Sequence, residues 1–581
     1  MIKNTLNNLF FHTSQIRKIQ FFFLLITTIG ASIIEMLSIV SVVPFVQAVT
    51  NNNFLEEKSL ILKFISISNR EEAIIKTGLF FSLLIFINSL LRCFLIYFGA
   101  KLANNVTAEL SIKIYRASLY DSYFNHISKQ SSNIISAVTQ KVYQTYNTVS
   151  AIINFTSSGI ILIGLISILI LINPRITFFA FIFFLLLYSI VVLFGKKILK
   201  KNSQIINDEQ NRIVLSLQNG LGIIREIILD KTHEYFIDVF AKANLRKAKS
   251  QAVNEIIQQS PRYILEAMGI FLIVLLIIFW NYFTSSSNTI IDFFPTLAAL
   301  AVGAQKILPI INILYLNFAI FKGNVYQVDE VVDILNEYEE KQKLKSLVDQ
   351  RKINFNSLIS FRNVSFFYKN TKEYILEDLN FEIKKGSKVG IIGKSGVGKS
   401  TLLDLLMGLL TPERGSIYVD GVKLTSDTLS SWQSKISHVP QKLFLSDSSF
   451  LENIAVGKLT NDIDFQKIEL VSKKVQLHDF IMNLNKKYYE QVGERGIKLS
   501  GGQIQRVGLA RSLYKNSEII IFDEATNSLD PETERLIMEE LYCLDENLTI
   551  IIVAHRINTL SKCDIIFELN NKKINLVNRK N

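Results

Sequence analysis

Cysteine is nearly absent from this sequence: its 581 residues include only Cys93, Cys543 and Cys563, which lie far apart and form no CxxC pair. Neither a disulfide framework nor a zinc site is supported, and a small stapled scaffold is excluded. Charged residues are also scarce, at 20% against 49% hydrophobic residues, which excludes a disordered chain. The net charge of +12 is compatible with nucleic-acid binding or with the cytoplasmic loops of a membrane protein.

The first part of the chain is rich in long apolar segments. Residues 1–322 are predicted to form a transmembrane domain, because each of six segments reaches the roughly 20 residues that cross a bilayer. Backbone groups in lipid must pair within their own segment, which predicts helices. The first segment has no small-residue cleavage site and is interpreted as a retained helix. The predicted spans cover about 20–49, 75–99, 148–172, 176–195, 263–284 and 288–320.

Positive charge concentrates in two long loops between these segments. Residues 101–147 carry five Lys/Arg and residues 196–262 carry twelve, whereas the short loop near 281–290 carries none. By the positive-inside rule, both long loops and both termini are predicted to be cytoplasmic. The surplus charge is therefore a topology signal, and we expect no nucleic-acid partner. Residues 58–68 fit either an interfacial helix on the outer side or a simple connector.

After a predicted linker at 323–355, residues 356–581 have the sequence pattern of a soluble α/β domain. A β-branched run leads into a GxxxxGKS motif and then into an apolar helical run, which is the context that a P-loop requires. Its glycines let backbone N–H groups face phosphate, Lys399 would reach the β and γ oxygens, and Ser400 would ligate Mg²⁺. The motif predicts an ATP-binding loop formed by Gly393, Lys394, Ser395, Gly396, Val397, Gly398, Lys399, Ser400 and Thr401.

A second motif ends a buried strand with two carboxylates, Asp523 and Glu524. In this arrangement the first carboxylate holds Mg²⁺ and the second polarises an attacking water. Alone, such a strand end is often structural. Together with the P-loop, it predicts an ATP hydrolase in which Lys399 and Glu524 are catalytic.

The pentapeptide Leu499-Ser500-Gly501-Gly502-Gln503 carries a family resemblance, because it resembles the signature of ABC-type ATPases. Six spans followed by one such domain are similar to an ABC exporter half-transporter. The resemblance implies that Ser500, Gly501 and Gly502 complete the ATP site of a second copy, so a homodimer with two shared sites is expected.

Further roles follow from the same resemblance. Tyr368 matches the aromatic residue that stacks on adenine, and Gln441 matches the glutamine that contacts Mg²⁺ beside Ser400 and Asp523. Ser528-Leu529-Asp530 matches a loop that communicates across the dimer. His555 matches the histidine that senses the γ-phosphate, and we count it among the catalytic residues.

Ionisable residues inside or at the ends of the spans offer a hint about the substrate, since they are costly in hydrocarbon. The cations Arg92, Arg262 and Lys306 would suit a phosphate-bearing substrate, and the acidic residues Glu35 and Glu266 also lie within the spans. Ion pairing between helices for the two glutamates, and snorkelling for Arg262, explain the same residues equally well.

The segments Ile34–Phe45 and Pro261–Gly269 resemble spans of the bacterial flippase for lipid-linked oligosaccharides used in protein glycosylation. That resemblance implies that Arg92, Arg262 and Lys306 hold a pyrophosphate and that 58–68 handles the lipid tail. The sequence departs from the pattern near Ile313, where a further cation is expected. The leading hypothesis is an ATP-driven flippase of the bacterial cytoplasmic membrane for an anionic, polyprenyl-linked glycan. An exporter of another lipid, peptide or drug is the alternative, and an ATPase-gated channel or sensor is a distant third.

Overall fold

The computed structural model describes residues 8–50, 70–172, 174–283, 289–346, 351–368, 373–524, 531–542, 547–554 and 560–577. The chain divides into two compact units. The first consists of Met1–Asp121 and His126–Glu340, and the second of Ser122–Asn125 and Lys341–Asn581. The domain limits predicted at 1–322, 323–355 and 356–581 stay predictions. The segment 58–68 lies outside the described residues.

The first unit is built from helices, several of them much longer than a membrane is thick. With 50 residues, α5 extends for about 75 Å at 1.5 Å per residue, against about 30 Å of hydrocarbon. The long helices thus continue well past a bilayer. The described helices between Gln15 and Ser346 are α2 (Gln15–Val40), α3 (Val42–Thr50), α5 (Arg70–Leu119), α6 (Tyr123–Ser128), α7 (Ser131–Ser136), a π-helical turn η2 (Ala137–Lys141), α8 (Val142–Ile172), α9 (Pro174–Gly222), α10 (Ile224–Asp230), α11 (His233–Phe283), α12 (Thr289–Gly323) and α13 (Val325–Ser346).

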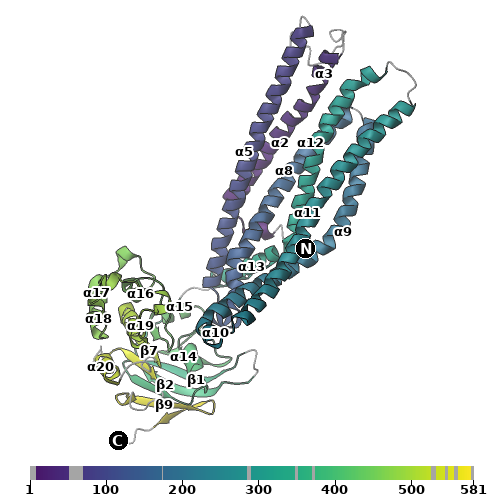
Figure 1. The fold of residues 1–581 in the computed structure, drawn as a ribbon. Coiled ribbons are helices and arrows are strands. Elements are labelled where there is room, and N and C mark those ends of the chain that lie inside the picture. Colours follow the sequence, from purple (N-terminus) through teal and green to yellow (C-terminus); the bar gives the residue numbers. More distant parts are fainter. Residues whose placement is uncertain are drawn as a thin grey trace. The chain divides into compact units, whose positions relative to one another are not determined.

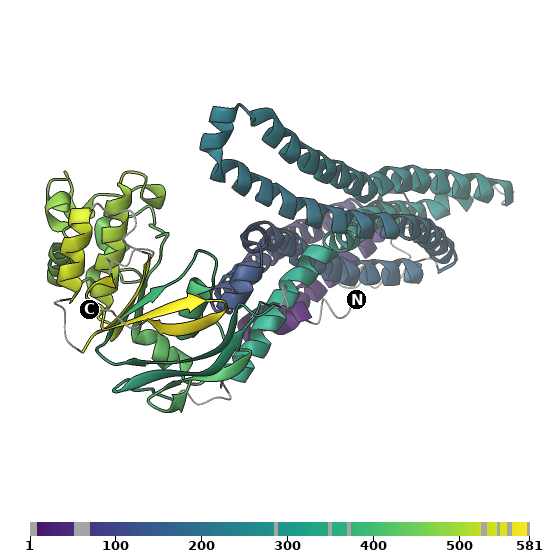
Figure 2. The same cartoon turned by 90° about the horizontal axis from the view of Figure 1, so that it is seen from below.

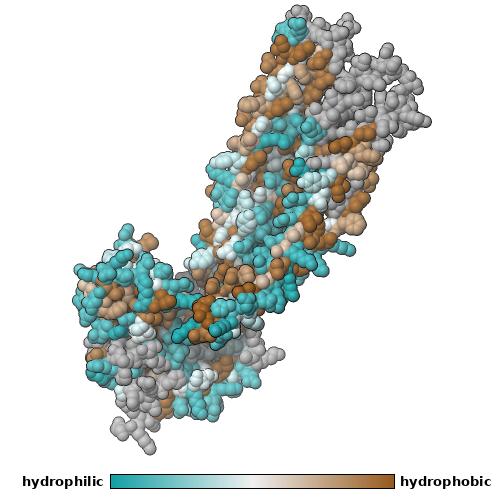
Figure 3. Space-filling view, viewed as in Figure 1, coloured by the Kyte–Doolittle hydropathy of each residue, from teal (hydrophilic) through white to brown (hydrophobic). Residues whose placement is uncertain are grey.

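Four stretches of the described residues are long and apolar enough to cross a membrane: Gln15–Val49, Glu71–Leu119, Ser131–Leu171 and Gln305–Gly323. They overlap the first, second, third and sixth predicted spans. The fourth and fifth predicted spans fall in α9 and α11, where many side chains lie outside the described set. Figure 3 shows hydrophobic side chains along the long helices of this unit.

Proline accounts for two boundaries in the helical unit. The first predicted span is continuous in sequence, but the structure breaks it at Ser41 between α2 and α3. Pro44 has no N–H to donate to the carbonyl of Val40, and its ring crowds that carbonyl, so the helix is interrupted there. Pro174 opens α9 directly after α8 ends at Ile172, because proline suits the first position of a helix.

Helix α8 packs against α2, α5 and α12. Helix α11 packs against α9 and α12 (Figure 1). The α9–α11 pair forms a hairpin closed by α10, and Figure 2 shows its α10 end extending away from the other helices. Buried apolar side chains from α2, α5, α8 and α13 form the main core of the unit.

The second unit contains two sheets. One has the strand order β2-β1-β4-β5, and the other has the order β10-β9-β3-β8-β7-β6. Its strands are β1 (Leu358–Phe366), β2 (Leu376–Lys384), β3 (Lys388–Ile392), β4 (Arg414–Val419), β5 (Val422–Lys423), β6 (Ile436–Val439), β7 (Ile519–Asp523), β8 (Thr549–Val553), β9 (Ile565–Asn570) and β10 (Lys573–Val577). Its helices include α14 (Lys399–Leu406), α15 (Leu429–Ser434), α16 (Phe450–Ile454), α17 (Phe465–Lys474), α18 (His478–Met482), α19 (Gly501–Lys515) and α20 (Pro531–Tyr542).

The larger sheet positions the chemistry. Strands β6, β7, β8, β3 and β9 pair in parallel, and only β10 is antiparallel. Near-continuous Ile/Val runs such as Thr549–Val553 form buried strands of this kind. Parallel strands bring their carboxyl ends to one edge of the sheet, where ligands of α/β folds bind. The P-loop, Gln441 and Asp523-Glu524 all follow or end such strands.

Candidate functional site

The P-loop links β3 to α14 and encloses its lysine. Gly398 has φ 110° and caps α14, and a side chain there would approach Ile375 Cγ2 to 2.9 Å. The side chain of Lys399 is 6% exposed, and its Nζ donates to the carbonyls of Gly393 at 2.9 Å and Lys394 at 3.2 Å. A buried cation beside the N–H groups that open α14 is suited to bind phosphate.

Two carboxylates and an amide lie next to the P-loop, and one of the carboxylates, Glu524, contacts Lys399. Ser400 Oγ donates to Asp523 Oδ2 at 3.4 Å. Glu524 adopts a left-handed φ of 53°, and its Oε1 lies 3.8 Å from Lys399 Nζ. Gln441 Nε2 donates to Glu524 Oε2 at 2.7 Å. The left-handed backbone of Glu524 is unfavourable for a non-glycine residue, so the surrounding structure must offset its cost. Residues in such conformations cluster at functional sites.

The charges at this edge shift one another's proton affinity. Burial raises the pKa of Asp523, and the neighbouring Glu524 raises it further. Burial, assisted by Asp523, raises the pKa of Asp404 to about 6. Sequence reasoning missed Asp404. Its signal was available, since Asp404 lies four residues after Ser400 on α14 and therefore on the same helix face.

The oxygen atoms at this site fit a magnesium ion. Ser400, Asp523 and Gln441 offer a hydroxyl, a carboxylate and an amide, the hard ligands that Mg²⁺ prefers. No group of three or more His, Cys, Asp or Glu that could hold a metal occurs among the residues that the structure describes. Few protein ligands are expected for Mg²⁺ bound together with nucleotide phosphates.

The remaining predicted nucleotide residues lie at two other places. The hydroxyl of Tyr368 is 3.5 Å from Thr401 Oγ1, and its ring meets Phe366 edge-on. Ser500 caps α19 in a capping box with Gln503, and both Ser500 and Gly501 are exposed. His555 and the segment Ser528–Asp530 lie outside the described residues.

The predicted cations of the membrane unit are not equally placed. Arg92 Nη2 lies 2.5 and 2.6 Å from the two carboxylate oxygens of Glu35. Lys306 Nζ lies 2.7 Å from Ser38 Oγ and 3.9 Å from Glu35 Oε1. Ion pairing between helices, the alternative left open by the sequence, therefore holds for Glu35. Arg262 is exposed on α11, and the side chain of Glu266 lies outside the described set.

A cavity of about 720 Å³ lies within the helical unit and is lined by α5, α8, α9, α11 and α12. Its polar lining is dominated by carboxamides. Asn254 and Gln258 approach α12 at Gly323. Arg92 and Glu255 also line it, together with the apolar Ile310 and Ile313. The eight amides are Gln144, Asn147, Asn154, Gln251, Asn254, Gln258, Asn317 and Asn324.

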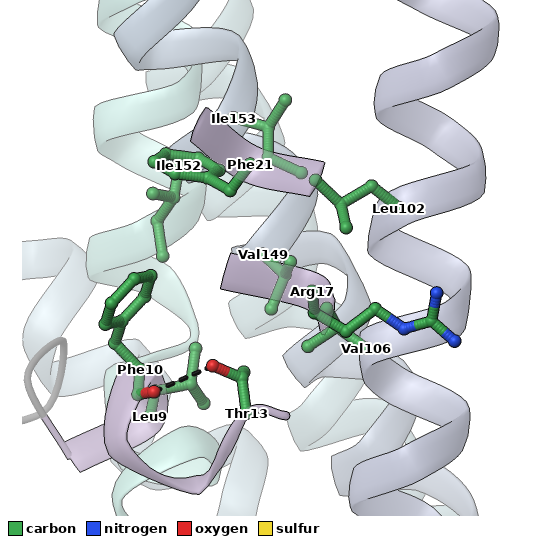
Figure 4. Close-up of a pocket in the computed structure, with 10 residues that line it drawn as sticks. All are labelled: Leu9, Phe10, Thr13, Arg17, Phe21, Leu102, Val106, Val149, Ile152 and Ile153. Carbon is green, nitrogen blue, oxygen red and sulfur yellow. Dashed lines mark hydrogen bonds between the residues drawn. The ribbon is translucent and has the colours of Figure 1, made fainter. Parts of the chain in front are cut away.

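A smaller cavity of about 270 Å³ lies near the start of α2 and is almost entirely apolar (Figure 4). Arg17 lines it, but its guanidinium points toward α5, where Nε donates to Glu109 Oε1 at 2.8 Å. Thr13 Oγ1 donates to the carbonyl of Phe10 at 2.7 Å. The two polar side chains are thus engaged within the protein, so the larger cavity offers the better site for a polar ligand.

Comparison with known proteins agrees with the geometry of the second unit. A family model described as ABC transporter matches residues 376–527. The chain is 26% identical over 491 residues to YgaD of Bacillus subtilis, named as a candidate multidrug export ATP-binding/permease protein. That match covers 82% of this chain and 81% of YgaD.

Matches to toxin exporters have a higher sequence identity but cover a smaller part of the chain. The leukotoxin export ATP-binding protein LtxB of Aggregatibacter actinomycetemcomitans is 40% identical over 37% of this chain and 30% of LtxB. The alpha-hemolysin translocation ATP-binding protein HlyB of Escherichia coli O6:H1 is 36% identical over 42% of this chain and 34% of HlyB. The chain thus matches about a third of the length of each.

A solved structure extends the likeness to the whole chain. The structure of a bacterial Atm1-family ABC exporter with ATP bound superimposes with a TM-score of 0.77 at 21% identity, covering 96% of this chain and 94% of that one. The predicted fold, a helical transmembrane region followed by an α/β ATPase domain, is confirmed. The chain has the fold of an ABC exporter and contains an ATP-hydrolysing domain of the ABC transporter family.

Proposed function

We propose that two copies of this chain form an ATP-driven exporter in a bacterial cytoplasmic membrane, with both termini and the ATPase domains on the cytoplasmic side. The observation that carries this proposal is the convergence of Lys399, Asp523, Glu524 and Gln441 at one edge of the parallel sheet. Positive loops at 101–147 and 196–262 support the orientation.

Each residue at this edge has a distinct task in hydrolysis. Lys399 and the N–H groups of the P-loop would hold the phosphates, and Ser400, Gln441 and Asp523 would hold Mg²⁺, which neutralises charge that develops on phosphate oxygens. Tyr368 would stack on the adenine. Glu524 would accept a proton from the attacking water, and Gln441, bonded to Glu524 at 2.7 Å, would hold that carboxylate in place. His555 would contact the γ-phosphate.

A second copy is needed because one chain offers only half of each site. The N-terminus of α19, capped by Ser500, is suited to bind an anion. Ser500 and Gly501 are exposed, so within one chain they are not packed against the P-loop. Beside them, Ile497 is 84% exposed, which suits a surface covered by a partner. The dimer would place Ser500, Gly501 and Gly502 against the phosphates of the other copy.

For the substrate, we propose a polyprenyl-pyrophosphate-linked oligosaccharide. Carboxamides donate and accept hydrogen bonds at once, which matches the hydroxyl groups of a glycan. Eight of them line the larger cavity, beside Arg92 for an anion and isoleucines for a lipid chain. ATP binding would close the two ATPase domains, with the loops near 110–125 and 205–228 as levers.

Transport in proteoliposomes tests this proposal. A fluorescent polyprenyl-pyrophosphate oligosaccharide is expected to change leaflets only with ATP and Mg²⁺, and not with Glu524→Gln. ATP-independent movement, or equal movement by that variant, would contradict the proposal.

Export of a small amphiphilic drug is the second candidate, favoured by the similarity to YgaD over 81% of its length. It predicts that dyes and drugs without phosphate stimulate ATP hydrolysis and are transported, whereas the glycolipid is not.

A further inference from the structure

The helical unit contains a charge cluster that ties three helices together, and one member of the cluster, Arg92, lines the larger cavity. Glu35 on α2, Arg92 on α5 and Lys306 on α12 are far apart in the sequence and meet through the packing of the helices. The Glu35 side chain is 2% exposed, whereas Arg92 is 41% exposed and Lys306 is 24% exposed. The carboxylate is thus enclosed, and the cations face outward from it.

The hydrogen bonds fix the guanidinium at the cavity wall. Both contacts to Glu35 start at one nitrogen, Nη2 of Arg92. Nε of Arg92 is buried and has no hydrogen-bond partner among the described residues. Arginine carries five N–H donors on three nitrogens, so Nη1 can still donate to a ligand while Nη2 holds Glu35. Ser38 completes the network, because its Oγ lies 2.7 Å from Lys306 Nζ and 2.7 Å from the carbonyl of Glu35.

The charges do not cancel. Two cations and one carboxylate leave a formal surplus of one positive charge inside the predicted spans, which is unfavourable in hydrocarbon unless an anion compensates it. Glu255, an acidic residue that lines the cavity, does not fill this role. Its neighbours Asn254 and Gln258 approach Gly323, which is 17 residues (323 − 306) beyond Lys306 along α12. That spacing amounts to about 25 Å of helix.

We propose that Glu35 is a positioning residue: it holds Arg92 at the cavity wall, with Lys306 beside it, so that the cluster selects the phosphate group of a transported amphiphile. The inference rests on the proposed export function and concerns its specificity. If the ion pair only stabilised the protein, exchanging the two charges between the helices would leave the response to a phosphate-bearing substrate unchanged.

Exchanging the two charges separates these roles. The variant Glu35→Arg/Arg92→Glu keeps an ion pair between α2 and α5 but puts a carboxylate at the cavity wall. A second variant, Glu35→Gln/Arg92→Gln, removes both members of the pair and leaves the net charge of the cluster unchanged. The partly exposed Lys306 keeps its contact with Ser38, so no buried carboxylate is left unpaired, and this variant serves if the exchange does not pack. Asp238→Asn, at an exposed pair on α11, is the matched control.

The assay is ATP hydrolysis by the full chain in phosphatidylcholine nanodiscs, with farnesyl phosphate as the probe. Farnesol, inorganic phosphate and phosphatidylglycerol are the other arms, and they separate a substrate phosphate from free phosphate and from a bilayer headgroup. Farnesyl phosphate alone is expected to stimulate the wild-type chain. Both double variants are expected to need at least ten times more probe for half-maximal stimulation, measured against each variant's own rate without probe, whereas Asp238→Asn responds like the wild type.

Stimulation of the charge-exchanged or the neutral variant at the wild-type concentration would overturn the proposal and leave the cluster a structural pair. Stimulation by farnesol, inorganic phosphate or phosphatidylglycerol at the same concentration would also overturn it. Those outcomes leave ATP-driven export intact, whereas loss of hydrolysis in the wild-type chain contradicts the proposed function itself.

Discussion

The ATPase unit and the membrane unit organise polar groups in opposite ways. In the ATPase unit, Lys399, Asp523 and Gln441 come from loops or strand ends that a parallel sheet brings to one edge. In the membrane unit, Glu35, Arg92 and Lys306 come from three long helices and meet only through tertiary packing. Short motifs therefore specify the first site, whereas no local pattern specifies the second.

The largest effect is expected in the ATPase unit. Glu524→Gln removes the carboxylate that we propose accepts the proton of the attacking water, so steady-state phosphate release should fall at least about 100-fold. Nucleotide binding should persist in an equilibrium binding assay. Glu539→Gln, at an exposed pair on α20, serves as control and should keep wild-type turnover. Wild-type turnover by Glu524→Gln would remove the basis for the assigned roles.

In the membrane unit, breaking one side of the charge cluster should mainly cost stability. Arg92→Gln leaves Glu35 buried with Lys306 at 3.9 Å as its nearest described cation, and should destabilise the chain by about 3 kcal/mol. The neutral double variant should lose much less. Thermal unfolding in nanodiscs measures both. Equal losses for the single and double variants would show that the ion pair contributes nothing specific.

Two serines allow a matched comparison inside the ATPase unit. Ser500 and Ser449 both form capping boxes, for α19 and α16. Replacing either with alanine should cost about 1 kcal/mol of stability through the lost cap. Only Ser500→Ala should also reduce ATP hydrolysis, by at least about tenfold, because its hydroxyl would face the phosphate of the partner copy. Similar hydrolysis by both variants would indicate that Ser500 only caps its helix.

The smallest effect concerns Asp404, whose pKa is raised to about 6 by burial and by Asp523. Because its proton is held more tightly in the folded state, stability is fully retained below about pH 4. It declines as pH rises from about 4 to 6, where the carboxyl ionises in the unfolded chain but stays protonated in the folded one, and it is constant above that range. Asp404→Asn should raise Tm at pH 7.5 by about 2–4 °C, the shift that roughly 1 kcal/mol gives, after allowance for partial exposure. It should change nothing at pH 4.

The sequence was sufficient for the fold and for the nucleotide motifs. Apolar run length predicts the helices, and GxxxxGKS between a strand and a helix predicts the loop around Lys399. It did not reveal Asp404, because a lone carboxylate on a helix has no motif. The interruption at Ser41 was missed as well, although Pro44 signals it.

The partner of Glu35 could not be predicted, since side chains on separate helices meet only after the helices pack. Sequence reasoning named Arg92 and Lys306 as cations for a substrate and ion pairing as the alternative. The structure supports pairing with Glu35 while leaving Arg92 at the cavity wall, so the two ideas are compatible.

Mixing two inactive chains tests the shared ATP sites most directly. A Lys399→Ala chain lacks the lysine that we propose binds phosphate, and a Ser500→Ala chain lacks the hydroxyl that we propose faces the partner's phosphate. In a mixed dimer, one site contains both changes and the other contains neither. Co-assembled in equal amounts, the two chains should recover about one quarter of wild-type ATP hydrolysis, because half of the dimers are mixed and each has one intact site of two. Hydrolysis no higher than the average of the two separate variants would contradict sites built from two copies.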